Sequence, residues 1–360
     1  MKITDVELTV VAYPRDYQGA SGQQLVLIDV KTDEGIDGYS MGWGVRGGVR
    51  TAEEIASVIR PQLIGEDPID RERIYHKIEK ADRWGGQLPF STYGPVDVAL
   101  WDITAKKAGL PLYKFIGGYR DRIPAYATGP AYPTPEDYVK EGLLAKKLGF
   151  RGYKLHPPGR ADLDIECCKR VREAVGPDFA LMSDPVGAYN FEEAMRVGRA
   201  LEKLGFLWYE EPLYDYEIHN YVRLTQALDI PVVACEWVAG RYHMAAEYIV
   251  RGAVDAVRSD VAWKGGFTGY LKTAHLCEAF GLNCEIHFGS YSLLNLANLH
   301  AACGVRNCTY LELVTDMNNF GIKPPVMKLD SEGCVQAPNE PGLGVEMDWD
   351  VIEPNVVRRI

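Results

Sequence analysis

The sequence has no surplus of basic residues, no long apolar run and no CxxC pair. Its 39 Lys and Arg against 50 Asp and Glu give a net charge of −11, which disfavours nucleic acid and anionic membranes as partners. No apolar stretch approaches the ~20 residues that a membrane span needs. The opening MKITDVELTVVAYPRD carries acids early and alternates like a strand, so we do not expect a signal peptide. These absences argue against nucleic acid, membranes and secretion, so we expect a cytoplasmic protein.

Cysteine is missing from the first part of the chain, because all eight cysteines lie at or beyond Cys167. A disulfide framework is typical of short secreted chains. In a chain of 360 residues we therefore expect buried free thiols. This length suits one barrel with an added domain or two medium domains.

The chain falls into three stretches with different hydrophobic patterns. Residues 1–50 alternate as strands do, and residues 51–107 have a helical pattern. From about residue 122, eight short β-rich segments alternate with amphipathic helical stretches. Glycines follow five of the expected helices, as C-terminal caps do: Gly149, Gly176, Gly205, Gly252 and Gly281.

Alternation of strand and helix predicts the α/β class, with a parallel sheet closed into a (β/α)₈ barrel. A doubly wound open sheet is the alternative, although eight strands in strict alternation favour closure. We predict an N-terminal α+β domain at residues 1–121 and the barrel at residues 122–318. The segment 319–360, rich in proline and glycine, is expected to pack back on the N-terminal domain.

Acidic residues end three successive predicted strands. Asp184, Glu210 and Glu236 each follow an apolar segment, and each lies 26 residues from the next. Since one βα unit spans that length, the spacing places the three carboxylates at one level of the barrel mouth. They would repel one another unless a cation neutralised them. Oxygen-only ligands favour a hard ion, Mg²⁺ before Mn²⁺ or Ca²⁺, whereas any single acid would be better interpreted as a solvated or helix-capping carboxylate.

Neighbouring strands bring proton-transfer groups to the same level. Lys154 and His156 lie two residues apart, so they share one face of their strand. Asp260 ends the sixth strand and His287 the seventh, and an aspartate can orient an imidazole and raise its pKa. Glu312 ends the eighth strand. The two groups would flank the metal on opposite sides, although a structural ion pair or a buried core histidine are the alternatives.

This combination resembles the enolase superfamily, and within it the mandelate racemase subgroup, over nearly the whole chain. The stretches DEGIDGYSMGWG and DVALWDITAKKAGLPLYKFIGG look like that family's capping-domain signatures. The resemblance implies that the N-terminal domain caps the barrel. It also implies that Asp184, Glu210 and Glu236 are Mg²⁺ ligands and that Glu211 completes a Glu-Glu-Pro motif. Asp260 and His287 would form an Asp–His dyad, and Glu312 would contact the substrate carboxylate.

Two positions depart from the family pattern. The second strand reads Lys154-Leu155-His156, where the family usually has Lys-x-Lys. By position His156 takes the place of the base, while Lys154 would bind the substrate carboxylate and lower the pKa of its neighbour. Which of the two histidines is the base stays open. After Asp184 the chain reads Pro-Val-Gly, where the subgroup often has an asparagine at the second position.

The resemblance implies Mg²⁺-dependent removal of the proton α to a substrate carboxylate, through an enediolate. We expect a hydro-lyase that dehydrates an acid sugar, an aldonate or aldarate, to a 2-keto-3-deoxy acid. A racemase or 2-epimerase of a hydroxy acid is the alternative, and a non-catalytic binding barrel is a distant one. Substrate contacts are expected from Tyr17, Trp43 and Arg46 of the cap, and from Glu211 and Trp237. Relatives commonly form dimers to octamers, so a homo-oligomer is also implied.

Overall fold

The structure is a computed structural model of the chain. The residues that it describes are 1–13, 23–44, 47–85, 88–288, 291–315, 319–323 and 326–360.

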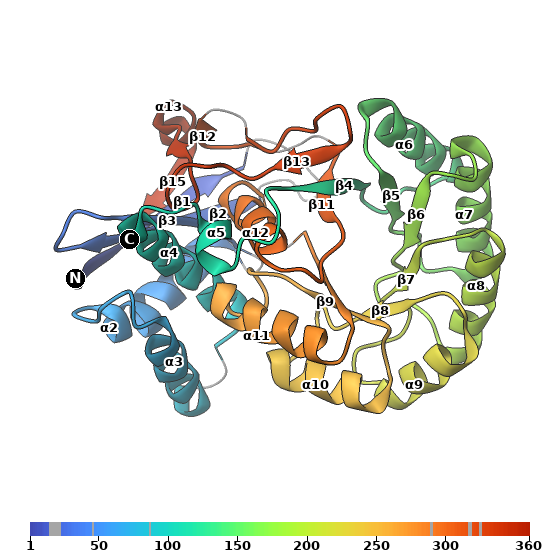
Figure 1. Ribbon diagram of the computed structural model, residues 1–360, viewed down its shortest axis with the longest axis horizontal. Coiled ribbons are helices and arrows are strands. Elements are labelled where there is room, and N and C mark those ends of the chain that lie inside the picture. The colour runs from blue at the N-terminus through green and yellow to red at the C-terminus, as the bar shows by residue number, and fades with distance from the viewer. Residues whose placement is uncertain (14–22, 45–46, 86–87, 289–290, 316–318, 324–325) are drawn as a thin grey trace.

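The cap is built on an antiparallel sheet in the order β15-β1-β2-β3, covered by helices (Figure 1). Its strands are β1 (Ile3–Ala12), β2 (Gln24–Thr32), β3 (Gly38–Trp43) and β15 (Val356–Arg359). Its helices are α1 (Gly48–Glu54), a π-helical turn (Ile55–Ile59), α2 (Arg60–Leu63), α3 (Arg71–Gly85), α4 (Phe90–Ala108) and α5 (Leu112–Ile116). Because β15 pairs with β1, the end of the chain joins the sheet formed by its beginning.

The central strand of the cap sheet, β2, is buried on both faces. Val26 and Ile28 pack into the core that the cap helices share. Leu25 and Leu27, on the opposite face, belong to the core of the barrel. Alternate residues of a strand point to opposite faces, so β2 connects the two cores and fixes the cap to the barrel.

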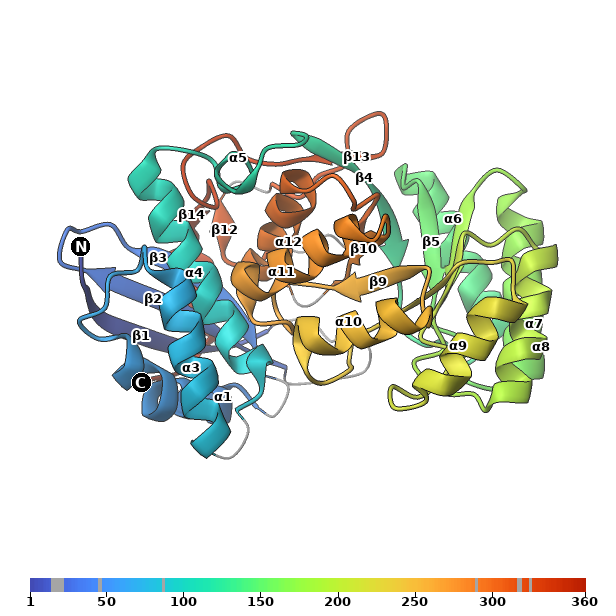
Figure 2. The ribbon, with the colours of Figure 1, turned by 60° about the horizontal axis from the view of Figure 1, so that its bottom comes forward.

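Eight parallel strands, β4 to β11, form the predicted barrel, and their order is β10-β9-β8-β7-β6-β5-β4-β11. Seven helices, α6 to α12, lie between them on the outside (Figures 1 and 2). The strands are β4 (Arg122–Thr128), β5 (Gly152–Leu155), β6 (Ala180–Ser183), β7 (Trp208–Glu210), β8 (Val232–Ala234), β9 (Ala256–Ser259), β10 (Asn283–Ile286) and β11 (Leu311–Val314). The helices are α6 (Pro135–Leu148), α7 (Ala161–Val175), α8 (Phe191–Lys203), α9 (Ile218–Ala227), α10 (Arg241–Arg251), α11 (Gly266–Ala279) and α12 (Leu293–Gly304).

Pairing of the first and last barrel strands excludes the open-sheet alternative, because β4 lies beside β11. Within the described ranges no strand pairing joins β10 to β11. Two hydrogen bonds connect β10 to the loop before β11 instead. The Glu285 carboxylate accepts from the backbone N–H of Thr309 at 3.0 Å, and the backbone N–H of Cys284 donates to the carbonyl oxygen of Asn307 at 2.7 Å. The predicted barrel is therefore confirmed in a modified form.

The remaining elements return the chain from the barrel to the cap. They are β12 (Ile322–Lys323), β13 (Cys334–Gln336), β14 (Glu346–Met347), α13 (Trp349–Ile352) and a 3₁₀ turn (Glu353–Asn355). Strand β13 runs antiparallel to the start of β4. The five helix-closing glycines all have positive φ, as their C-terminal positions predict.

Helix α4 of the cap rests on the barrel loop that follows β9. The Asp97 carboxylate accepts hydrogen bonds from Thr268, at 2.9 Å from its N–H and 2.8 Å from its hydroxyl. A Cβ at Gly94 would clash with the carbonyl oxygens of Val261 and Ala262. Only glycine permits this close approach, which holds the cap against the barrel mouth.

No helix in the described part of the chain combines the length and apolarity that a membrane crossing requires. All eight cysteines are free, and seven are buried. The expectation of buried free thiols is confirmed for those seven.

Candidate active site

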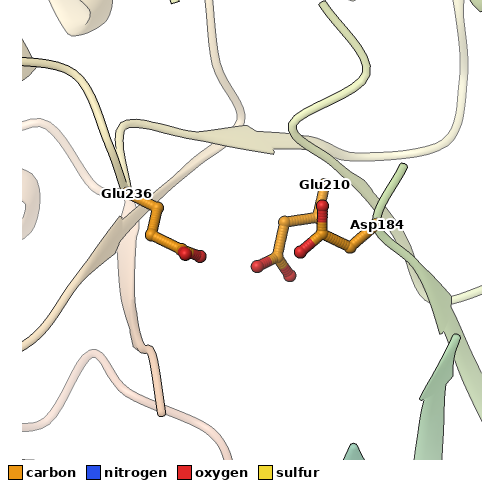
Figure 3. A group of neighbouring side chains, drawn as sticks. All are labelled: Asp184, Glu210 and Glu236. Atoms are coloured by element: carbon orange, nitrogen blue, oxygen red, sulfur yellow. The ribbon is translucent and has the colours of Figure 1, made fainter. Parts of the chain in front are cut away.

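Three carboxylates converge at the C-terminal rim of the barrel. Asp184 directly follows β6, Glu210 ends β7, and Glu236 lies two residues past β8. All three are buried, and one oxygen of each lies within 4.8 Å of the others. Figure 3 shows the side chains pointing toward one shared space.

The donor set of these acids fits a hard divalent cation. Glu236 Oε2 is buried and has no hydrogen-bond partner. A buried carboxylate oxygen without a partner is costly, and a bound cation would supply one. Three buried carboxylates with an open coordination position are the oxygen ligands that such ions take.

A residue with positive φ other than glycine lies within two residues of each acid. These residues are Val186, Glu211 and Cys235. Such conformations cost of order 1–3 kcal/mol and cluster at functional sites. Glu211 also shapes the next strand end, because its carboxylate accepts a hydrogen bond from the N–H of Glu236 at 3.0 Å.

Lys154 is a fixed cation beneath this group. Its Nζ lies 3.3 Å from Asp184 Oδ2, 2.8 Å from Glu210 Oε1 and 3.0 Å from Glu312 Oε1. Burial alone would lower the pKa of Lys154, but Glu210 and Glu312 raise it well above its usual range. The amine is therefore a charged partner for the carboxylates.

His156 stands at one end of the carboxylate group. Its Nδ1 lies 2.7 Å from the carbonyl oxygen of Gly129, and its Nε2 lies 3.2 Å from Asp184 Oδ2. Since a carbonyl only accepts, Nδ1 carries a hydrogen, and Nε2 is the atom that faces the other acids. Burial opposes the charge on His156, but Asp184 overrides it and raises the pKa.

His287 stands at the other end. Its Nδ1 lies 3.0 Å from Asp260 Oδ2 and its Nε2 lies 3.0 Å from Glu236 Oε1. Asp260 is itself held by the N–H groups of Ala262 and Trp263, at 2.5 and 2.6 Å. Burial would lower the pKa of His287, but Glu236 and Asp260 raise it to about 10. Two imidazole Nε2 atoms thus flank the three acids.

The other predicted site residues do not all lie where the sequence placed them. Glu312 lies inside β11 rather than at its end, since the strand continues to Val314. Trp43 and Trp237 line the pocket above the acids, whereas the buried Glu211 is not among the lining residues. Tyr17 and Arg46 lie outside the described residues.

Five pocket residues were not expected from the sequence: Gln23, Thr128, Val186, Phe288 and Tyr291. The pocket has an empty volume of about 730 Å³, including the part open to solvent. Gln23 Oε1 and Thr128 Oγ1 are buried without hydrogen-bond partners. A signal for Thr128 was available, because it ends the first barrel strand as the acids end later ones.

A buried arginine was also missed. Arg258 lies on β9, two residues before Asp260, with none of its surface exposed. Spacing of two along a strand places both side chains on the same face, so this residue could have been assigned to the site from the sequence.

Aromatic side chains connect cap and barrel at the pocket wall. The ring of Trp263 lies 5.6 Å from that of Trp43 in the cap and 4.4 Å from that of Trp237 in the barrel. The wall is therefore built from both parts of the molecule.

Comparison with known proteins gives matches over nearly the whole chain. An arabinonate dehydratase from Saccharolobus solfataricus is 32% identical over 340 residues, covering 92% of this chain and 90% of that protein. The crystal structure of a D-glucarate dehydratase from Agrobacterium tumefaciens complexed with magnesium superimposes with a TM-score of 0.90 at 36% identity, covering 99% of this chain and 100% of that one. A racemase from Streptomyces coelicolor A3(2) with bound magnesium gives 0.87 at 25% identity, with 99% and 100% covered.

Family models match both parts of the chain. Residues 6–117 match the mandelate racemase / muconate lactonizing enzyme N-terminal domain, and residues 138–351 match the enolase C-terminal domain-like model. The magnesium-bound neighbours and the three acids together support a divalent metal in this fold. The chain belongs to the mandelate racemase / muconate lactonizing enzyme family of the enolase superfamily.

Proposed function

We propose that this protein dehydrates an acid sugar, an aldonate or aldarate, to a 2-keto-3-deoxy acid. The observation that carries the proposal is the placement of two imidazoles at opposite ends of one carboxylate group. Dehydration needs a base at the α-carbon and an acid at the β-hydroxyl. The dehydratases among the similar proteins support this choice of reaction.

Asp184, Glu210 and Glu236 would hold the ion, which we propose is Mg²⁺, with Mn²⁺ as a substitute. When bound, the ion would stabilise the negative charge that develops on the substrate carboxylate as the α-proton leaves. Lys154 adds a fixed positive charge beneath these acids, which would help to balance the negative charge of a substrate carboxylate bound above it.

His156 is the proposed base. With its hydrogen on Nδ1 toward Gly129, a neutral His156 presents a free electron pair on Nε2. That atom takes the α-proton, and the electron pair of the C–H bond moves into the enediolate. His287, whose pKa is raised by Glu236 and Asp260, donates its Nε2 proton to the β-hydroxyl. The hydroxyl leaves as water, and the enol product tautomerises to the 2-keto-3-deoxy acid.

Substrate contacts are proposed on both walls of the pocket. Trp43 and Trp237 line it from the cap and the barrel, and we keep Tyr17 and Arg46, which lie outside the described residues, as proposed contacts. For Glu211 the contact with the N–H of Glu236 favours a role in holding that ligand over direct substrate binding. Thr128 offers a buried hydroxyl without a partner, which suits a polyhydroxylated substrate.

Racemisation or epimerisation at the α-carbon is the second candidate. The same two histidines serve inversion if one removes the α-proton and the other returns a proton to the opposite face. The racemase with bound magnesium among the structural neighbours supports this alternative. The two reactions differ only in whether a β-hydroxyl leaves.

Incubation of a panel of aldonates and aldarates with the protein and Mg²⁺ tests for dehydration and for epimerisation. We expect 2-keto acids, detected with semicarbazide, and their loss in His287→Asn. His76→Asn is the matched control, because His76 is an exposed histidine of the cap that pairs with Glu79. α-Proton exchange in D₂O with inversion but no keto acid would select the epimerase. Absence of both exchange and keto acid for every acid would reject the proposed chemistry.

We further propose a cytoplasmic homo-oligomer. Its seven buried free thiols suit a reducing compartment. Light scattering during size exclusion would measure the assembly, and a monomer mass would reject the oligomer.

A further inference from the structure

Arg258 is a fully buried charged residue whose contacts reach three other strands of the barrel. Its Nε lies 2.8 Å from Glu210 Oε1, and its Nη2 lies 2.5 Å from Glu312 Oε2. Its Nη1 donates to the carbonyl of Ile286 at 2.7 Å. One guanidinium therefore connects strands β7, β10 and β11 below the rim, and it touches one of the three converging acids directly.

Glu312 is surrounded by groups that can only donate hydrogen bonds. Its Oε1 lies 3.0 Å from Lys154 Nζ. Its Oε2 accepts from Arg258 and, at 2.8 Å, from the N–H of Phe288. Neither a lysine ammonium, a guanidinium nor a backbone N–H can accept, so a proton on Glu312 would face a donor. The arrangement requires an ionised carboxylate with a fixed orientation.

Glu210 is held in a similar way. Its Oε1 faces both Lys154 and Arg258 at 2.8 Å, and its Oε2 accepts from Trp208 Nε1 at 2.9 Å. Each carboxylate oxygen has two acceptor positions. The Arg258 Nε contact is an ion pair without a hydrogen bond, so Lys154 and Trp208 take one acceptor position on each oxygen. Together these contacts hold the side chain so that it points toward the other two acids.

We infer that Arg258 is a positioning residue of the metal site, which orients Glu210 as a ligand and keeps Glu312 as an ionised hydrogen-bond acceptor. The inference rests on the proposed function, in which Asp184, Glu210 and Glu236 bind Mg²⁺. Groups behind a metal ligand typically change metal affinity 10–100-fold when they are removed. Without Arg258, Glu210 would lose an ion pair and Glu312 would lose the hydrogen bond from Nη2, so both buried side chains would be free to turn.

The alternative effect of Arg258 is simple repulsion of the cation. A positive charge this close to the ligands lowers the attraction for a metal ion, so its removal would tighten binding if charge alone mattered. The two effects have opposite signs. Metal affinity therefore distinguishes them without any substrate.

Isothermal titration of Mg²⁺ into Arg258→Met, Arg258→Lys and the wild type tests the inference. We expect the Kd for Mg²⁺ to rise about 10–100-fold in Arg258→Met. The Kd of Arg258→Lys should lie between those of the wild type and Arg258→Met. An ammonium keeps the positive charge but cannot reach both acids as the guanidinium does. Arg122→Met is the matched control, since Arg122 is a half-exposed arginine paired with Asp330 and Glu332.

The outcomes distinguish failure of this inference from failure of the proposed function. Unchanged or tighter Mg²⁺ binding in folded Arg258→Met, with only a lower melting temperature, would overturn the inference and leave Arg258 a structural residue. If Arg258→Met does not fold, the Arg258→Lys titration decides, and wild-type affinity there would also overturn it. A wild type that binds no Mg²⁺ would instead reject the proposed function itself.

Discussion

Replacement of Thr128 by valine should stabilise the protein and impair it at the same time. Thr128 is 3% exposed, and its hydroxyl has no hydrogen-bond partner. A buried polar group without a partner costs ~1–3 kcal/mol, so a side chain of similar shape without the hydroxyl should raise the free energy of unfolding by ~1 kcal/mol. In a chain of 360 residues that corresponds to a melting temperature higher by only ~1–2 °C.

Activity should change in the opposite direction. If the hydroxyl pairs with a substrate hydroxyl, Thr128→Val leaves that substrate group unpaired, and kcat/KM should fall about 10–100-fold. Thr128→Ser keeps the hydroxyl and should retain most of the activity. Thermal unfolding and kcat/KM are measured on the same Mg²⁺-loaded samples. A less stable Thr128→Val with wild-type kcat/KM would refute the reasoning, because the hydroxyl would then serve the fold rather than the substrate.

Three further predictions concern the ligands, the bases and the cap. Glu236→Gln removes an anionic oxygen, so its Kd for Mg²⁺ should rise at least ~10-fold by calorimetry; unchanged affinity would exclude Glu236 as a ligand. His156→Asn and His287→Asn should each lower dehydration by ~10²–10⁴, and α-proton exchange followed by NMR in D₂O should persist only in the variant that keeps the base. Burial raises the pKa of Asp97 to about 7, against the opposing effect of Thr268. The folded state therefore holds the proton more tightly between pH ~4 and ~7, and wild-type stability relative to Asp97→Asn should fall by up to ~4 kcal/mol as pH rises through that window. Urea unfolding at pH 5 and pH 8 measures this, and equal differences at both pH values would contradict it.

The barrel and its ring of acids could be predicted because both depend on local regularity. Parallel strands end at one rim, and βα units of constant length bring their ends to one level. Equal spacing of Asp184, Glu210 and Glu236 therefore predicted that they meet. The exact strand ends were less predictable: Glu312 lies within β11, because strand ends depend on pairing partners that the local sequence does not specify.

The contacts that hold the acids in place could not be predicted in the same way. The spacing of two from Asp260 could place Arg258 on the face of the site, but its contact with Glu312, 54 residues away in the sequence, could not be predicted. Thr128 could be placed at a strand end, but the lack of hydrogen-bond partners at Gln23 Oε1 and Thr128 Oγ1 could not be predicted. Both properties arise from tertiary packing, which periodicity and spacing do not encode.

The charge balance of the site explains why a set of acids is more informative than any single one. Six buried carboxylates meet three buried basic residues at the part of the barrel mouth that the structure describes: Asp184, Glu210, Glu211, Glu236, Asp260 and Glu312 against Lys154, Arg258 and Lys264. Lys154 and Arg258 lie on the Glu210 and Glu312 side, whereas Glu236 has one histidine contact and one oxygen without a hydrogen-bond partner. Even with both histidines protonated, a net negative charge remains in a buried region, where uncompensated charge is most costly. A divalent ion would remove that cost, so the set of acids supports a divalent metal in this fold where no single acid would.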